Sequence, residues 1–376
     1  MTWGKLARIL TKTAVLFALC NALFVATNAM DWLNGVSIYN TIVPGRTRLP
    51  YSDNPTAAYS LSPDSVTAMF ASHTVRRPKA DDEFRVLLIG DPGIWGWLLE
   101  PDKTLDAALN RLDLRAPDGR RVVVYNLAYP IQAVLKDLML LDEAMQYEPD
   151  AVIWFLTLDG LPRDKQIYPP LVQRNAERAR DLIARYTLAL DPADERFVET
   201  TWWDSTILGS RRGLADWLRL QLFGFSWAAT GIDQAIPAQF TPVRVDQEAD
   251  STWNSIEGPS ELDRADLALD VLAAGAERVT SAGATLQFVN EPIFITPGAN
   301  GDLRYNSWYP RWAYDAYRVI LADECAAQVW SCLDLWDAVP PDEFTNSPVH
   351  LSAEGWAIVA QAVGARMASE MSISVP

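Results

Sequence analysis

Apolar residues gather in short unbroken runs from residue 83 onward, and amphipathic segments separate these runs. The runs, which we predict to be strands, cover residues 84–90, 122–128, 151–157, 285–295 and 328–336. Apolar residues at helical spacing predict helices over residues 103–112, 134–147, 262–281, 310–327 and 353–370. Strands that lack a polar face and alternate with helices are typical of a parallel sheet covered on both sides. The pattern therefore predicts an α/β domain with three layers, α/β/α, over residues 83–376.

A long insertion, residues 161–261, separates the third and fourth predicted strands. Loops of such length without secondary structure are uncommon. Residues 211–227 are amphipathic, with Leu214, Leu218 and Leu222 toward one face. This stretch is either a helix that lies on a membrane surface or a lid packed on the core, and the lid is the commoner outcome.

The N-terminus has the pattern of a membrane-directed segment. Lys5, Arg8 and Lys12 precede an apolar run at 13–29, and Asp31 follows it. This charge asymmetry predicts that the chain beyond residue 30 lies outside the cytoplasm. The run is either a cleaved signal peptide or an uncleaved single-pass anchor at the cell membrane, and its length favours the anchor. Residues 31–82, rich in Pro, Ser, Thr and Asn, are predicted to form an extended stalk.

Composition narrows the classes of partner. The formal net charge is −16, so we expect no nucleic acid partner, because phosphate binding needs a clustered positive field. The chain has only two histidines, His73 and His350, and lacks metal-ligand spacings, so we expect neither a metal nor another cofactor. Cys325 and Cys332 form a disulfide or remain two separate thiols, and the sequence leaves this open.

Four polar segments are expected to meet at the carboxyl edge of the sheet, where open parallel sheets bind ligands. "GDPGIWG" at 90–96 follows the first strand, and "NLAYPIQ" at 126–132 follows the second. "TLDGLP" at 157–162 follows the third strand, and "NSPVHLSAEG" at 346–355 precedes the last helix. Asp91, Asp159 and His350 carry the chemistry of this set.

The four segments together resemble the SGNH (GDSL-like) hydrolase superfamily over roughly residues 84–371, on the order, position and spacing of the motifs. More narrowly, the chain resembles membrane-anchored relatives associated with O-acylation of envelope polysaccharides. The resemblance implies a flavodoxin-like parallel sheet. It places His350 at the catalytic histidine and either Asn346 or Ser347 at the aspartate that orients it.

The same resemblance implies a degenerate catalytic site. The family's first motif is Gly-Asp-Ser, and this chain has Pro92 at the serine, with neither a hydroxyl nor a backbone N–H. Asp159 stands at the family's oxyanion asparagine, and a carboxylate there would repel an oxyanion. The glycine of the second motif falls near Ala128 or Ile131. Asn346 or Ser347 would stabilise an imidazolium less than a carboxylate does.

Another chemistry at the same edge stays open. Asp91 and Asp159 with His350 could support acid–base hydrolysis or a metal. The competing interpretation is that both aspartates cap local turns, a common role for short acidic residues.

A second candidate site is an aromatic, polar segment at 289–318, after the fourth strand. A sugar-binding cleft would use ring faces such as Trp308 together with polar side chains. The candidate ligand-binding residues are Glu291, Arg304, Asn306, Trp308 and Arg311. The competing interpretation is a loop packed over the sheet, with its charges in structural pairs.

Three functional hypotheses follow. The first is a catalytically degenerate protein that binds an envelope polysaccharide or supports its O-acylation beside a membrane-bound O-acyltransferase. The second is an active esterase or O-acyltransferase with an unrecognised nucleophile. The third is a structural subunit of a membrane complex.

Overall fold

The computed structural model describes residues 2–370, except 53–60, 233, 255, 257 and 259. Its centre is a five-stranded sheet of order β2-β1-β3-β4-β5, in which every neighbouring pair is parallel. The strands are β1 (Glu83–Ile89), β2 (Arg121–Asn126), β3 (Ala151–Leu156), β4 (Thr285–Asn290) and β5 (Ser331–Asp334). The predicted parallel α/β fold is confirmed. The strand order reverses between β1 and β3, which is the point where such sheets bind ligands.

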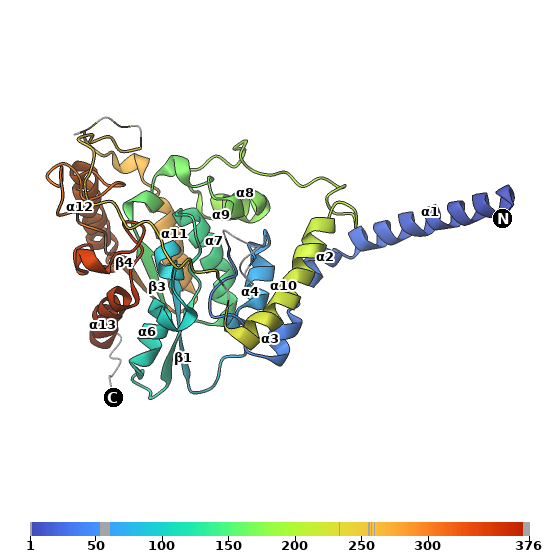
Figure 1. Cartoon of the computed structure of the whole chain (residues 1–376), viewed down its shortest axis with the longest axis horizontal. Coiled ribbons are helices and arrows are strands. Elements are labelled where there is room, and N and C mark those ends of the chain that lie inside the picture. The colour runs from blue at the N-terminus through green and yellow to red at the C-terminus, as the bar shows by residue number, and fades with distance from the viewer. Residues whose placement is uncertain are drawn as a thin grey trace.

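Helices cover both faces of the sheet (Figure 1). They are α4 (Val66–Ser72), α5 (Pro92–Trp95), α6 (Leu105–Arg111), α7 (Val134–Ala144), α8 (Pro170–Arg174), α9 (Ala176–Tyr186), α11 (Leu269–Ser281), α12 (Arg311–Gln328) and α13 (Ala353–Glu370). Side chains along β1 alternate between two cores, as a strand requires. Leu87 and Ile89 pack with α7, α11 and α12. Val86 and Leu88 pack with α6 and α13 on the other face.

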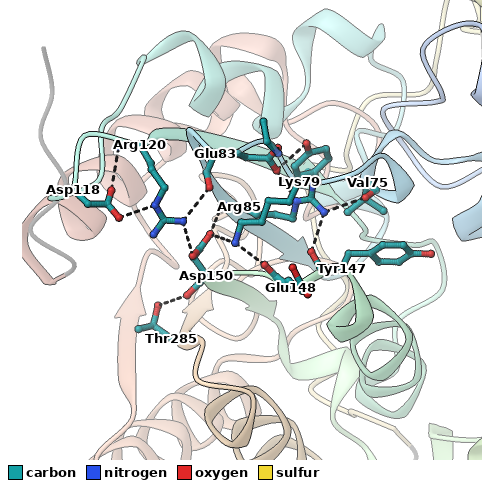
Figure 2. Close-up of polar contacts among 12 residues, drawn as sticks. Val75, Lys79, Glu83, Arg85, Asp118, Arg120, Tyr147, Glu148, Asp150 and Thr285 are labelled. Atoms are coloured by element: carbon teal, nitrogen blue, oxygen red, sulfur yellow. Dashed lines mark hydrogen bonds and ion pairs between the residues drawn. The ribbon is translucent and has the colours of Figure 1, made fainter.

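A charged cluster holds the strands together at the amino end of the sheet, opposite the predicted site (Figure 2). Asp150, just before β3, accepts a hydrogen bond from the backbone N–H of Arg85 at 2.7 Å and pairs with Lys79 and Arg120 at 2.6 and 2.9 Å. The buried Arg85 guanidinium pairs in turn with Glu83 at 2.5 Å. These ion pairs neutralise the charged side chains that are buried at the start of β1. The cluster therefore has a structural role.

The N-terminal region begins with α1 (Trp3–Ala26), which projects from the domain (Figure 1). Short helices α2 (Ala29–Asn34) and α3 (Ile38–Ile42) follow. Within the interval predicted as a stalk, residues 53–60 lie outside the described residues. The described parts pack tightly, because Tyr39, Met69 and Phe70 are fully buried. This interval is therefore part of the packed domain on either side of the gap.

The insertion contains α10 (Arg211–Thr230), which covers the predicted amphipathic stretch. Its neighbours are α2, α3 and α4. Gly224 faces the Tyr39 ring so closely that an added Cβ would lie 2.2 Å from it. The helix thus packs on the N-terminal segments.

Cys325 and Cys332 form a disulfide between the end of α12 and β5. The bridge closes the short turn that returns the chain from the helix to the edge strand. β5 is shorter than the strand predicted at 328–336, because Gln328 still belongs to α12 and Leu335 and Trp336 belong to the loop that follows β5.

Candidate functional site at the carboxyl edge of the sheet

The turn after β1 places Asp91 and Pro92 at the start of α5. Oδ1 of Asp91 accepts hydrogen bonds from the backbone N–H groups of Gly93 at 2.7 Å and Ile94 at 3.2 Å. Gln132 donates to Oδ2 at 2.8 Å. Proline is favoured at the first helical position, where its missing N–H costs nothing. The helix start that could hold an anion is therefore capped by the chain's own carboxylate.

The loop before α13 lies directly over this turn. An added Cβ on Gly93 would lie 2.6 Å from the backbone oxygen of Val349, so only glycine fits there. This contact brings the next residue, His350, to the edge where β1 ends. The predicted meeting of the first and last motifs is thus present in the structure.

His350 is buried and held by an amide. Its Nδ1 lies 2.9 Å from Oδ1 of Asn346, and the Trp97 ring stacks on the imidazole at 5.6 Å. Nε2 has no hydrogen-bond partner among the described residues. Burial lowers the His350 pKa to about 4, and the Asp91 carboxylate only partly opposes this. The ring is therefore neutral at pH 7, and with Nδ1–H donated to Asn346, Nε2 offers a lone pair.

Of the two residues expected at the orienting position, Asn346 contacts the imidazole. Ser347 instead accepts a hydrogen bond from the Val349 backbone at 3.3 Å. The site therefore has an amide where the resemblance implies an aspartate.

Glu291, the first residue after β4, is a buried acid beside Asp91. It is 1% exposed, and neither carboxyl oxygen finds a hydrogen-bond partner in the described part of the chain. Burial raises its pKa well above the ordinary value, and the Asp91 carboxylate raises it further. Glu291 therefore favours its protonated form more strongly than an exposed glutamate does. The sequence analysis assigned Glu291 to the candidate sugar-binding cleft of the aromatic segment, whereas in the structure its carboxyl group lies beside Asp91.

Asp159 lies in a 3₁₀ turn after β3 and pairs with Lys165, at 2.5 Å. Burial raises its pKa, and Lys165 opposes this rise. Its backbone N–H donates to the Tyr309 hydroxyl at 3.3 Å, and that hydroxyl also bonds Thr157 at 2.8 Å. The carboxylate at this position thus has a cation partner from its own loop.

Lys136, which was not among the predicted site residues, supports the turn after β1. It is fully buried, donates to the backbone oxygens of Gly90, at 3.0 Å, and Tyr129, and pairs with Asp137 at 2.8 Å. Burial raises the Asp137 pKa to about 6, against the effect of Lys136. The signal was a Lys-Asp pair inside an otherwise apolar helical stretch, "VLKDLMLL".

Most polar residues of the aromatic segment bind backbone groups. The Arg304 guanidinium donates to backbone oxygens of residues 250, 252, 306 and 307. The fully buried Asn306 donates to Phe294 O at 2.8 Å and accepts from two backbone N–H groups. Arg311 donates to Gly301 O at 2.6 Å and lies over the Tyr305 ring. These three side chains hold the segment in its fold.

The two tryptophans of this segment are both half-buried. Trp308 contacts the Tyr309 ring edge-on at 6.1 Å. Trp312 donates its indole N–H to Ser251 O at 2.6 Å. Trp312 therefore ties the insertion to α12, whereas the indole of Trp308 is free of such a tie in the described residues.

No group of three or more His, Cys, Asp or Glu side chains in the described part of the chain is placed to hold a metal ion. Asp91 lies beside both Glu291 and His350 and, apart from the effect of burial, raises the pKa of each. These three residues, hereafter the carboxyl–imidazole cluster, combine a buried acid, a carboxyl group that caps a helix start and a neutral imidazole. Such a cluster can bind polar groups and can donate or accept a proton.

Comparisons with known proteins find similarity only among solved structures. No family model and no curated protein matches the chain. A GDSL-like lipase from Bacteroides thetaiotaomicron is 10% identical with a TM-score of 0.37, covering 81% of this chain and 98% of that one. A carbohydrate acetylesterase family member from Sinorhizobium meliloti is 11% identical with a TM-score of 0.35, covering 77% and 99%. A second carbohydrate acetylesterase from that organism is 13% identical with a TM-score of 0.33, covering 76% and 98%. Among the solved structures to which this chain is similar, one is thus described as a GDSL-like lipase and two as carbohydrate acetylesterases.

Proposed function

We propose that this protein is a membrane-anchored, extracytoplasmic SGNH-hydrolase-like domain that has lost serine-based ester chemistry. It binds an envelope polysaccharide, or supports its O-acylation as the partner of a membrane-bound O-acyltransferase. The observation that carries the proposal is the Asp91–Pro92 turn, where the chain caps its own helix start and presents no hydroxyl.

Several parts of an acyl-transfer site are changed together. Pro92 removes both the nucleophile and one backbone donor. The loss of one oxyanion donor costs on the order of 10²–10³ in rate. Asp159 introduces a carboxylate at the position of the oxyanion asparagine. Asn346 stands where an aspartate would stabilise the imidazolium of the histidine. The His350 pKa of about 4 supports the same conclusion, because the ring is a poor proton acceptor at neutral pH.

The anchor rests on α1. In the part of the chain that the structure describes, α1 is the helix long and apolar enough to cross a membrane, with a mean hydropathy of 1.9. The basic flank before it and Asp31 after it favour an outside location for the domain. The Cys325–Cys332 disulfide is consistent with an oxidising compartment.

One observation favours a second candidate function, hydrolysis by general acid–base chemistry. The carboxyl–imidazole cluster contains Glu291, whose pKa is raised well above its ordinary value by burial, and His350, whose Nε2 has no hydrogen-bond partner among the described residues. In this candidate function Nε2, although a weak base because of its low pKa, would accept a proton from a water molecule, and Glu291 would protonate the leaving oxygen. The two candidates differ in whether any ester turnover depends on Glu291.

The test uses the full chain in detergent. We expect no covalent adduct with a fluorophosphonate by intact mass, and aryl acetate turnover no faster than that of His350→Ala. An adduct on a serine or threonine hydroxyl would overturn the first candidate. Turnover that disappears in Glu291→Gln, a neutral variant of the same size, would support the acid–base candidate. Retention of the wild-type chain on extracted envelope polysaccharide is the positive expectation.

A further inference from the structure

The last part of the connection between α9 and α10, residues 199–210, lies against α1. The backbone N–H of Ile207 donates to Oδ1 of Asn21 at 3.0 Å. Asn21 is the buried residue of α1, and its amide also donates to Phe17 O at 2.9 Å. It lies five residues before the end of the helix at Ala26. The insertion therefore reaches back alongside the apolar helix (Figure 1).

This segment satisfies its polar groups internally. The Thr206 hydroxyl, in a residue that is 2% exposed, donates to Trp203 O at 2.7 Å. Asp204 accepts from the backbone and hydroxyl of Thr201 at 2.8 and 2.6 Å, and Ser210 donates to Asp204 O at 2.8 Å. Backbone groups leave water at low cost only when they are paired in this way. These internal bonds lower the cost of placing the segment against the headgroup layer of a membrane.

Its large apolar side chains point outward. Trp202 is 67% exposed and Trp203 is 53% exposed. The outer face of α10 continues this surface with Leu218, Leu222 and Phe225, at i, i+4 and i+7. Exposed apolar patches of this kind mark surfaces that contact either another protein or a membrane.

Charge on α10 suits a lipid headgroup layer. The whole chain has a net charge of −16, whereas residues 211–219 hold three arginines and one aspartate, Asp216, which pairs with Arg212 and Arg219 at 3.7 and 3.6 Å. Arg211 and Arg212 are exposed at the helix start, beside the tryptophan-bearing segment. Basic residues next to exposed tryptophans are typical of surfaces that lie at a bilayer interface.

We propose that residues 199–210 and the outer face of α10 form a second membrane contact, seated in the outer leaflet of the bilayer that α1 spans. The contact rests on the anchor in the proposed function. Trp202 and Trp203 lie at headgroup depth, and the arginines bind lipid phosphates. The hydrogen bond between Ile207 and Asn21 joins this contact to α1, so the domain is held in one orientation against the membrane.

The test is a depth measurement on the full chain. Trp203→Cys in a Cys20→Ser background is labelled with an environment-sensitive fluorophore and inserted into phosphatidylcholine–phosphatidylglycerol vesicles. Val319→Cys is the matched control, an exposed apolar residue on α12 at 61% exposure. Nitroxide-bearing lipids should remove most of the emission at position 203 and leave position 319 unchanged. Leu208→Cys gives a second position on the segment if Trp203→Cys lowers the melting temperature.

Flotation of the vesicles separates this inference from the anchor. Protein that floats and resists high salt, with no lipid quenching at positions 203 and 208, would overturn the membrane contact and leave the anchor standing. Protein that fails to float would refute the anchor itself. Shielding of position 203 from a water-soluble quencher, without quenching by lipid, would assign the surface to a second copy of the chain and would also overturn the proposal.

Discussion

His350 and Asn346 are joined through Nδ1 and Oδ1 at 2.9 Å, so an amide orients the imidazole at the carboxyl edge of the sheet. An amide fixes the ring and its tautomer as a carboxylate would. It supplies no negative charge to an imidazolium, and burial then sets the pKa of about 4.

The first prediction concerns that missing charge. Asn346→Asp should raise the His350 pKa, because a carboxylate at this distance favours the protonated ring. The chain has two histidines, so an NMR titration of the ring protons resolves them once a His73 variant assigns the second peak. Asn346→Ala is the control, since it removes the amide without adding charge. A His350 pKa equal in Asn346→Asp and Asn346→Ala would refute the electrostatic argument.

The second prediction concerns restoration of the nucleophile. Pro92→Ser alone should recover little esterase activity, because Asp159 and Asn346 stay unfavourable for an oxyanion and an imidazolium. Pro92→Ser with Asp159→Asn and Asn346→Asp should react with a fluorophosphonate faster than the single variant. Intact mass over time measures the rates. Equal labelling of the single and triple variants would show that the two other positions do not limit the site.

The third prediction uses the pH dependence of stability at Glu291. Its pKa in the folded chain lies above the ordinary value of 4.5, so the folded state keeps a proton that the unfolded state releases. Stability from this group is therefore complete below pH 4.5 and is lost as the pH rises above it. Glu291→Gln should match the wild type near pH 4 and exceed it in melting temperature at pH 7. A difference that grows toward acid pH would contradict the assignment.

The fourth prediction concerns the disulfide. Cys325 and Cys332 are seven positions apart, and a loop of this size stabilises a fold by about 2–3 kcal/mol in the chain-entropy model. Cys332→Ser should lower the melting temperature. In denaturant the wild-type chain should show one reactive thiol, from Cys20, and three after reduction. Three thiols before reduction would exclude the bridge.

The layers of the fold could be predicted because strands such as β1 and β3 are apolar on both faces and alternate with helices, which is typical of a covered parallel sheet. The approach of Asp91 to His350 could also be predicted, because parallel strands end at one edge. Which other side chains lie next to them at that edge could not be predicted. Glu291 joins Asp91 because β4 pairs with β3 in a particular register, and no local pattern encodes that pairing. The contact between Asn21 and Ile207 spans 186 positions and likewise leaves no periodic signal.

The last prediction separates packing from ligand contact in the aromatic segment. Trp312 donates to Ser251 O and packs against the core, so Trp312→Ala should lower stability, by less than the about 3 kcal/mol typical of a fully buried aromatic because Trp312 is half-buried. The indole of Trp308 makes no such bond in the described residues, although its ring packs against the core, so Trp308→Ala should lower the melting temperature less than Trp312→Ala does. If this loop contacts the polysaccharide, Trp308→Ala should weaken binding by about 2 kcal/mol, the loss expected of a hot-spot aromatic. Thermal melting beside binding to extracted polysaccharide measures both variants. Unchanged binding by Trp308→Ala would remove the loop from the ligand site and leave the carboxyl–imidazole cluster as the place where a glycan would have to bind.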